Sequence, residues 1–441
     1  MLRFQSLRDC RIFIQTNFYL ARCPEEALIW VEKLALTPWR CYDKRGDKKG
    51  SEMSRQHMDS AVFDNLASTM ADHGTDAAIE QLCQVLREKK DYASLFYALL
   101  LKKRFELGVS PIPTGSAQEL PEESHEPYEE AIRLAGREVG QLYLEQGDIP
   151  RAWAYFRMLG ENEAVKGALD KYQPREDDDV QQLVDIAFHQ GVNPQRGFDL
   201  LLERFGICSA ITMVSSQEMG MPGGVRDYCI RKLVRALHGE LCQRLKAEIA
   251  RHDGSAPDVP SVKELIAGRD WLFADDFYHI DISHLGAVVQ MSIFLPVGEE
   301  LSMARELCEY GKRLSPRFLG AGEPPFEKQY QDYAVYLSAL AGDNVEEAIA
   351  HFEAKVDKAD PENEGTRPAE VLVNLLLRLE RPEEALAVAR RHLASVNSRP
   401  LGCPSIVELC QLTKNYRALA DVAREQGDLV HFVAGLVAAN Q

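Results

Sequence analysis

The 441-residue sequence lacks the features of two large protein classes. No apolar run approaches the roughly 20 residues that a membrane-spanning helix needs, because Gln290 and Ser292 interrupt the best candidate, residues 285–295. Positive charge is in deficit, with 51 Lys and Arg against 68 Asp and Glu and a formal net charge of -17. Proteins that bind nucleic acid need cationic side chains at the phosphates. We therefore expect a protein that neither crosses a membrane nor binds nucleic acid.

The cysteines also lack the arrangement of a disulfide or zinc framework. All ten are scattered, and no CxxC pair occurs. This pattern is typical of buried free thiols in a reducing compartment. Residues 15–17, Gln-Thr-Asn, interrupt the apolar stretch that an N-terminal signal peptide would require. These observations predict a cytoplasmic protein.

Established catalytic motifs are missing as well. The sequence contains no P-loop, no H-E-x-x-H and no G-x-G-x-x-G after a strand. Residues 201–216 carry Gly206 and Cys208 but lack G-x-S-x-G, and no strand precedes them. We interpret Gly206 as the end of a helix and Cys208 as a core residue. The sequence thus predicts a non-catalytic protein without a cofactor.

Helical periodicity is present almost throughout. In residues 76–90 the apolar side chains recur on one helical face, and Asp91 is suited to cap a second helix over 91–107. The two segments predict an antiparallel hairpin. No series of alternating apolar and polar strands with hairpin turns occurs. An all-α fold is therefore expected.

Stretches rich in Pro, Gly, Ser and Glu divide the helices into blocks. The expected divisions are an N-terminal extension (1–52), a hairpin region (53–107), a Pro- and Glu-rich linker (108–127), helical repeats (128–251), a short linker (252–260), a helical block (261–325) and C-terminal repeats (326–441).

Residues 1–52 have two interpretations. They are richer in basic residues than the rest of the chain and end in the polar run DKRGDKKGSE, so Met53 is a possible true start. However, CPEEALIWVEKL at 23–34 echoes RPEEALAVARRHL at 381–393. The extension would then hold a degenerate repeat helix, and both interpretations stay open.

Internal repeats are the most informative pattern. In GREVGQLYLEQGDIPRAWAYF (136–156), Gly140, Tyr143, Ala152 and Phe156 stand at the relative positions that a tetratricopeptide repeat uses. The sequence here resembles that family. Weaker copies place Ala339, Ala348 and Phe352, then Leu376, Ala385 and Ala389, then Leu409, Ala418 and Val422 at matching positions. The small residues at 348, 385 and 418 are 37 and 33 positions apart, close to the 34 of this family.

Turn residues agree with the repeats. Gly147-Asp148, Gly342-Asp343 and Gly427-Asp428 each combine a Gly suited to end one helix with an Asp able to cap the next. Arg381-Pro382 places Pro at a first helical position instead.

The resemblance covers residues 128–172 and 326–441, and it implies antiparallel helix pairs stacked into a right-handed superhelix. In such a superhelix the first helix of each pair lines a concave groove, which suits a peptide or partner protein. Whether residues 175–315 continue the superhelix or form a separate block stays open. A non-catalytic interaction scaffold is therefore the first expectation, and a structural subunit of a larger assembly, stacked through its apolar ends, is an alternative.

The stretch DDFYHIDISHL, residues 275–285, has two interpretations. Asp281 can be the N-cap of a helix that begins near Ile282. Alternatively His279, Asp281 and His284 are metal ligands, and residues 276–284 form the centre of a metal-dependent enzyme or metal-binding module. Helical zinc sites commonly use His-x3-His, whereas these two histidines are five apart. The N-cap interpretation explains the stretch more simply.

Residues 223–252 form a second candidate. Cys229, His238 and Cys242 lie on one predicted helix, where His238 and Cys242 share a face and Cys229 lies nearly opposite. A Cys-His nucleophile pair stays open but has no identifiable orienting partner. A buried leucine stripe at 233, 237, 241 and 245 favours His238 at the edge of the core. The acidic run PREDDDV (174–180) is expected to begin the helix VQQLVDIAFHQ.

Overall fold

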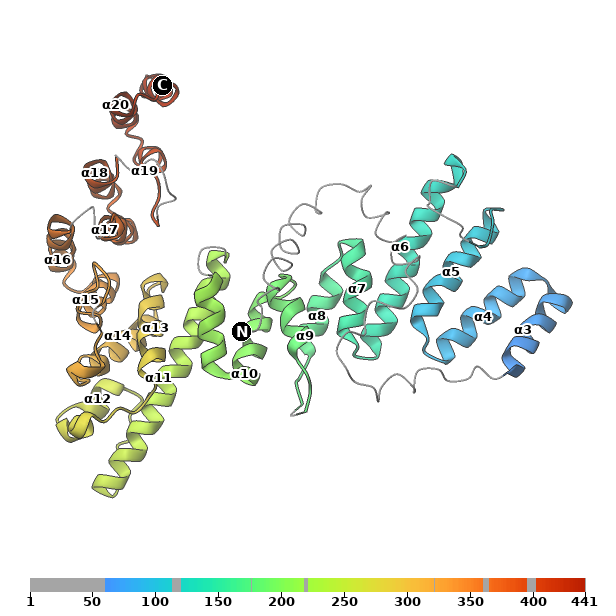
Figure 1. Cartoon of the computed structure of the whole chain (residues 1–441), viewed down its shortest axis with the longest axis horizontal. Coiled ribbons are helices and arrows are strands. Elements are labelled where there is room, and N and C mark those ends of the chain that lie inside the picture. Colours follow the sequence, from blue (N-terminus) through green and yellow to red (C-terminus); the bar gives the residue numbers. More distant parts are fainter. Residues whose placement is uncertain are drawn as a thin grey trace, which may run out of the picture. The chain divides into compact units, whose positions relative to one another are not determined.

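The structure, a computed structural model, is all-α (Figure 1). It describes residues 60–112, 120–175, 177–217, 221–320, 322–359, 365–394 and 402–440, and no strand occurs among them. Neither interpretation of residues 1–52 can be judged, because the segment lies outside these ranges. The chain forms two compact units that meet between Gly197 and Phe198, within the stretch expected to be one repeat block (128–251). Each unit is described by itself.

In the first unit each helix from α3 to α8 contacts the next one along the chain. Its elements are α3 (Ser60–His73), α4 (Thr75–Glu88), α5 (Tyr92–Glu106), α6 (Glu122–Glu145), α7 (Ile149–Leu159), α8 (Glu163–Lys171), α9 (Gln181–Val184) and the π-helix η2 (Asp185–His189). The predicted hairpin is confirmed as α4 and α5, and the side chain of Asp91 accepts a hydrogen bond from the Ser94 backbone N–H. The acidic run precedes α9, as expected, with Asp179 accepting from the Gln181 N–H at 3.0 Å.

The predicted linker extends too far into the first unit. Helix α6 begins at Glu122, so only the first part of the 108–127 stretch connects helices. Glu122 and Glu123 occupy the first turn, where the positive end of the helix dipole favours carboxylates. The acidic composition that indicated an exposed linker is therefore also that of a helix start. Pro127 lies inside the helix and removes one backbone hydrogen bond.

Helices α6 and α7 cross closely through the residues of the best repeat copy. A Cβ atom on Gly140 would lie 2.7 Å from the ring of Phe156, which is closer than real Cβ contacts allow. Ala152 is fully buried, and Tyr143 and Phe156 are nearly so. The small residues thus let the two helix axes approach until an aromatic ring fills the space between them.

The second unit begins with helices that depart from the pair pattern. Helix α11 (Gly223–Asp253) is contacted by α12 (Val262–Ile266), α13 (Ile282–Met291) and α14 (Glu299–Gly311). The predicted leucine stripe is confirmed, because Leu233, Leu237, Leu241 and Leu245 are fully buried. The short 3-10 helices are η3 (Asp270–Asp276), η4 (Ser292–Phe294) and η5 (Pro316–Phe318). Residues 223–311 are therefore a helical block around one long helix.

One core assignment was wrong in this unit. Helix α10 (Pro194–Gln217) is broken at Gly206, which has a φ of 76°, so the predicted interruption is present. Cys208, however, is exposed. After the break, Ala210, Ile211 and Val214 form the buried face, and Cys208 lies outside it. The change of direction at Gly206 moves the buried stripe to residues that a continuous helix would not select.

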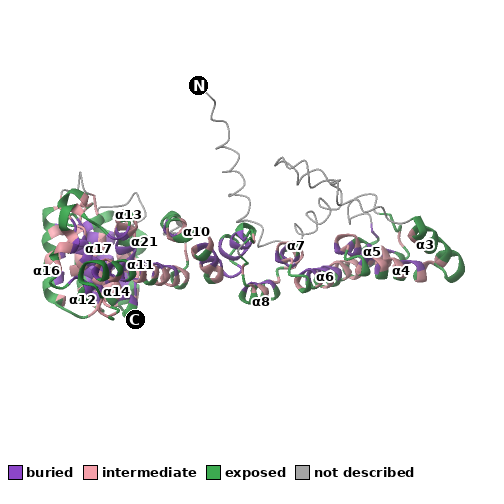
Figure 2. Cartoon of the chain, turned by 90° about the horizontal axis from the view of Figure 1, so that it is seen from below, coloured by how far each residue is buried: buried purple, intermediate pink, exposed green. Residues whose placement is uncertain are grey.

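The remaining helices stack in sequence order, each contacting the next. They are α15 (Tyr330–Leu340), α16 (Val345–Lys358), α17 (Arg367–Arg378), α18 (Pro382–His392), α19 (Ile406–Thr413), α20 (Tyr416–Gln426) and α21 (Leu429–Ala439). The repeat positions predicted at 339, 348, 352, 376, 385, 389, 409, 418 and 422 are all buried. Figure 2 shows this burial as purple inner surfaces of these helices. Helices α15 to α21 thus form a stack in which each helix packs on the next one along the chain.

The glycine predictions are confirmed at all three Gly-Asp pairs, and the Asp caps are confirmed at two of them. Gly147, Gly342 and Gly427 have left-handed φ values of 77°, 86° and 73°. The side chains of Asp148 and Asp428 each accept hydrogen bonds from the first turn of the following helix. Asp343 does not cap α16, because Asn344 occupies the N-cap position. Its carboxylate instead pairs with Arg305 at 2.6 Å, which satisfies it away from the helix end.

Arg378 joins the stack to the helical block of the second unit. From the end of α17, its guanidinium donates hydrogen bonds to the carbonyl oxygens of Ile293 and Leu295. Both carbonyls belong to the tight turn around η4. Burial lowers the pKa of Arg378.

Among the described residues, no helix combines the length and apolar character needed to span a membrane.

Candidate functional site

The DDFYHIDISHL stretch forms the connection between η3 and α13. Asp281 is the N-cap of α13, as one interpretation predicted, and its carboxylate accepts from the backbone N–H groups of Ser283 (2.8 Å) and His284 (3.1 Å). The Ser283 hydroxyl and these N–H groups lower the pKa of Asp281. Asp276 pairs with Arg317. The carboxylates of Asp276 and Asp281 therefore have structural partners.

His279 is the buried residue of the stretch. It is 5% exposed and lies edge-on to the rings of Phe273, Phe277 and Tyr310. Its backbone N–H donates to the Tyr310 hydroxyl at 2.8 Å, and its Nδ1 lies 3.1 Å from the same oxygen. Burial lowers the pKa of His279. The imidazole is thus a neutral ring in an aromatic cluster.

The structure does not bring the three candidate ligands together as a metal site. His279 faces the aromatic cluster, Asp281 caps α13, and His284 is half-buried one residue after Ser283. Within the described ranges, no group of three or more His, Cys, Asp or Glu side chains is arranged to hold a metal ion. His279 precedes α13 and His284 lies in its first turn, so the start of the helix at Ile282 separates the two histidines.

His238 has the partner that the sequence did not reveal. Its Nε2 donates to Glu306 of α14 at 2.8 Å, and its Nδ1 lies 3.8 Å from the thiol of Cys242. Glu306 also accepts from the Ser261 hydroxyl (2.6 Å) and the Val262 N–H (2.8 Å) at the start of α12. Cys229 is buried elsewhere on α11 and has no part in this cluster.

These groups resemble a Cys-His-Glu arrangement in composition but are enclosed. His238 is 5% exposed and Cys242 is 8% exposed, and the thiol donates to the Pro260 carbonyl at 3.3 Å. A nucleophile must reach its substrate, which this burial prevents. The cluster instead holds α11, α12 and α14 together.

We expect this cluster to make stability depend on pH. Burial alone would lower the pKa of His238, but the hydrogen bonds to Cys242 and Glu306 outweigh it and raise the pKa to about 9. Because this value lies above the ordinary 6.5, the charged imidazole stabilises the fold fully below pH 6.5, and the contribution is lost as the pH rises through 9. The contribution is at most about 3 kcal/mol.

Urea unfolding of the wild type and His238→Gln at pH 6, 7.5 and 9.5 measures this effect. The difference in unfolding free energy between the two proteins should be largest at pH 6 and shrink toward pH 9.5. A difference that stays constant over this range would show that the imidazolium charge does not contribute.

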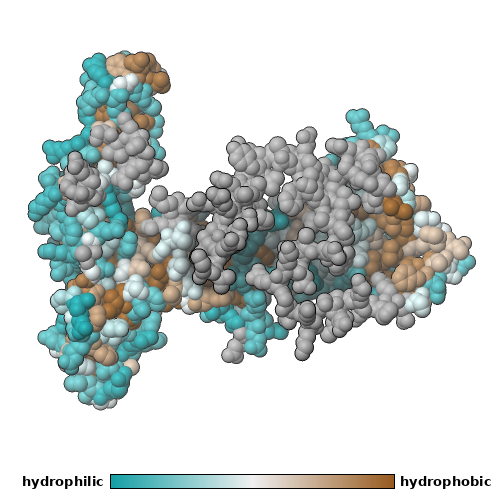
Figure 3. Space-filling view, in the orientation of Figure 1, coloured by the Kyte–Doolittle hydropathy of each residue, from teal (hydrophilic) through white to brown (hydrophobic). Residues whose placement is uncertain are grey.

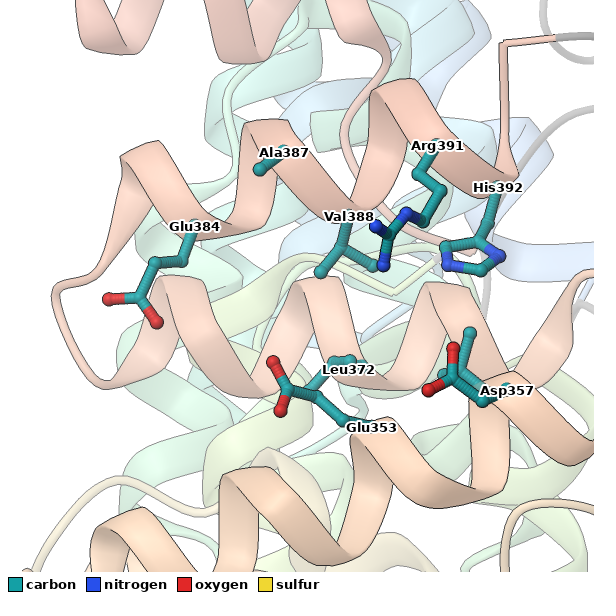
Figure 4. A pocket seen from close by; sticks show the side chains of 9 residues that line it. Glu353, Asp357, Leu372, Glu384, Ala387, Val388, Arg391 and His392 are labelled. Atoms are coloured by element: carbon teal, nitrogen blue, oxygen red, sulfur yellow. The ribbon is translucent and has the colours of Figure 1, made fainter.

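An open groove in the C-terminal stack is the candidate binding site. It has a volume of about 390 Å³ and lies between α16 and α18, over α17 (Figure 4). This volume falls within the range of ligand-binding pockets, about 300–1,000 Å³. We call it the α17 groove, and its lining residues are Glu353, Val356, Asp357, Leu372, Glu384, Ala387, Val388, Arg391 and His392.

The α17 groove has an apolar middle and charged rims. Val356, Leu372 and Val388 supply the apolar part. In Figure 4, Glu353 lies toward the end of the groove near Glu384, at the opposite end from His392. The groove can therefore contact an apolar side chain while its rims distinguish charges.

Its charged groups differ in how far they are already paired. Glu384 forms an ion pair with Arg381 at 2.5 Å. Among the described residues, Glu353, Asp357 and Arg391 form no ion pair, so these charges are available to a ligand. Burial and the neighbouring Arg391 charge lower the pKa of His392, partly offset by Asp357. The imidazole is therefore neutral at neutral pH.

The sequence did not predict this groove. The expected surface was lined by the first helices of the pairs, whereas the α17 groove is lined mainly by the second helices, α16 and α18. On α17, Glu370 and Asn374 contact the backbone of Gly402 instead, at 2.8 Å each. The available signal was the spacing 384, 387, 388, 391 on one face of α18, but only the fold places α16 opposite.

The chain matches no protein-family model, no curated protein and no solved structure.

Proposed function

We propose that this protein is a non-catalytic scaffold of tetratricopeptide-like helix pairs that binds a segment of a partner protein in the α17 groove. The observation that carries the proposal is the groove itself, because it combines an apolar middle with unpaired charges on both rims. The close crossing of α6 and α7 at Gly140 and the buried repeat positions of α15 to α20 support the repeat assignment. A stack of helix pairs leaves such surfaces largely pre-formed.

The chemistry of the groove indicates the kind of segment. A Lys or Arg of the ligand would lie near Glu353, and a carboxylate of the ligand would lie near Arg391. An apolar side chain between them would cover Val356 and Val388. The expected ligand is therefore a peptide segment with charges of both signs around an apolar residue.

Site-specific photo-crosslinking tests this proposal. A photoreactive residue at Ala387, which is exposed and lines the groove, should crosslink a partner protein in extracts of the native host. The crosslink should be lost when Glu353→Lys and Arg391→Glu are added. The matched control places the photoreactive residue at the exposed Glu347 of α16, outside the groove lining. Equal products from both positions, or products insensitive to the charge reversals, would contradict the proposal.

A second candidate function is that of a structural subunit, and the last helix favours it. Five apolar residues of α21 are 44–77% exposed: Leu429, Val430, Val433, Leu436 and Val437. Figure 3 shows this end of the second unit as brown, apolar surface. Such a face can stack on another copy of the chain. Light scattering separates the candidates, because an assembly would exceed the 49.6 kDa of one chain.

A further inference from the structure

Helix α21 is apolar nearly all round, but the described residues cover mainly one side of it. Among the described helices of at least eight residues, α13 and α21 alone contain no Asp, Glu, Lys or Arg. Helix α13 is contacted by α11, α14 and α15, whereas the main neighbour of α21 is α20. A helix that is apolar all round is ordinarily buried all round. The composition of α21 therefore indicates a second covering element on the side away from α20.

Gly435 fixes the side of α21 that faces α20. A Cβ atom on Gly435 would lie 2.9 Å from the backbone nitrogen of Ala420 and 2.9 Å from the carbonyl oxygen of Tyr416, so the two helices cross closely here. Gly435 is also the buried residue of α21. At 3.6 residues per turn, Val433 lies about 160° around the helix from Gly435. Val433 therefore faces away from α20.

The exposed apolar stripe of α21 is symmetric about Val433. Leu429 and Val437 lie four residues before and after it, and Val430 and Leu436 lie three residues before and after it. These five residues are 44–77% exposed. In a twofold pair of identical helices, each contact of residue i with residue j is repeated as a contact of j with i. An antiparallel pair with its axis at Val433 would therefore set Leu429 against Val437 of the second copy, and Val430 against its Leu436.

The size and the charge of the stripe fit a second copy of the chain. The stripe exposes on the order of 500 Å², near the top of the range for the largest apolar patch of a monomer, about 300–600 Å². Two stripes face to face would bury about 1,000 Å², the size at which specific interfaces begin. Copies of a chain with a net charge of -17 repel each other. Residues 429–439, without Asp, Glu, Lys or Arg, provide an uncharged surface at which they can meet.

We propose that two copies of the chain pair through antiparallel α21 helices, with a twofold axis at Val433. An unrelated partner protein would not require a symmetric stripe, whereas this pairing does. The antiparallel arrangement also sets the positive end of each helix dipole beside the negative end of the other. The inference rests on the structural-subunit candidate, for which it names the partner and the contact, and it does not depend on the α17 groove.

Analytical ultracentrifugation of the full chain measures the pairing. At micromolar concentration the wild type should have twice the 49.6 kDa mass of one chain. Val433→Glu should weaken the dimer at least about 100-fold, because two carboxylates would face each other at the axis. Ala434→Glu is the matched control, since Ala434 is exposed but lies outside the stripe. This variant should remain a dimer.

Cysteine crosslinking tests the direction of the helices. Facing helices lie about 8–10 Å apart, with Cα atoms about 2.3 Å from each axis, so two cysteines at the twofold axis come within disulfide distance. Val433→Cys should therefore form a disulfide between two copies, identified by mass spectrometry of the joined peptides. Leu429→Cys alone should not, because the two copies of residue 429 would lie on opposite sides of the axis. The double variant Leu429→Cys/Val437→Cys should crosslink the two copies again.

The outcomes separate this inference from the structural-subunit candidate. A monomeric wild type would overturn both. An oligomer that Val433→Cys does not crosslink would overturn the twofold pairing alone and indicate head-to-tail stacking. A disulfide between two copies of Leu429→Cys would overturn the antiparallel direction. Equal effects of Val433→Glu and Ala434→Glu on the dimer would show that the stripe is not the contact.

Discussion

Replacing Gly311 by alanine should destabilise the second unit by about 3 kcal/mol. Gly311 is the last residue of α14, and a Cβ atom there would lie 2.4–2.7 Å from ring carbons of Tyr330 in α15. Tyr330 is 2% exposed, so its ring has no free space into which to move. Inserting a methyl group into a packed core commonly costs about 1–3 kcal/mol, and this contact is among the closest in the protein. Urea unfolding monitored by circular dichroism measures the change.

The sign of the effect separates packing from helix propensity. Glycine to alanine within an exposed part of a helix ordinarily stabilises by about 0.5–1 kcal/mol. Gly239→Ala in α11 is the matched control, because no atom lies within 4 Å of the added Cβ. We expect Gly239→Ala to stabilise and Gly311→Ala to destabilise. Stabilisation by both substitutions would show that α14 and α15 are not packed as described.

Asp332→Ala should have the second large effect, a loss of about 3 kcal/mol. Asp332 is 1% exposed, and its carboxylate accepts hydrogen bonds from His351 (2.9 Å), Lys355 (2.9 Å) and the backbone N–H of Lys328 (2.8 Å). The contacts join α15 to α16 and to the turn before α15. Removing one partner of a buried charged network costs about 3–5 kcal/mol, and the value here lies at the low end because Lys355 also pairs with Glu327.

Asp343→Ala provides the comparison for Asp332→Ala. Asp343 pairs with Arg305 at 2.6 Å, but its side chain is 57% exposed. An exposed pair of this kind contributes about 0–1 kcal/mol. Thermal or urea unfolding of both variants should therefore give clearly different losses of stability. Similar losses would mean that the Asp332 network is as open to water as the Asp343 pair.

Local rules of the backbone explain why much of the architecture could be predicted from the sequence. The Asp91, Asp148 and Asp428 caps, the left-handed Gly147 and Gly427 and the start of α13 at Ile282 depend on a few consecutive residues. Repeat positions and the α11 leucine stripe follow from helical periodicity, which is also a property of neighbouring residues. The all-α class, the α4 and α5 hairpin and the buried repeat positions were accordingly predicted.

The errors arose where the same composition suits two structures. Acidic residues such as Glu122 and Glu123 are typical both of an exposed linker and of the first turn of a helix, and here they form the first turn of α6. Asp343 is one residue too early to cap α16 and pairs with a distant arginine instead. Cys208 follows a break that turns the buried face away from it. For Asp343 a contact with a distant residue decided the outcome, and for Cys208 the change of direction at Gly206 did so.

The sequence by itself determined which segments are helices, where most of them begin and end, and which face of each is apolar. Only the tertiary structure decided what those faces meet. Glu306 reaches His238 from 68 positions along the chain, and α16 lies opposite α18 across the α17 groove. The physical reason is that helix periodicity fixes the direction of side chains around one axis, whereas the crossing of two axes depends on side-chain shapes from both helices. The charged network of His238 and Glu306 and the α17 groove both form where side chains from different helices meet.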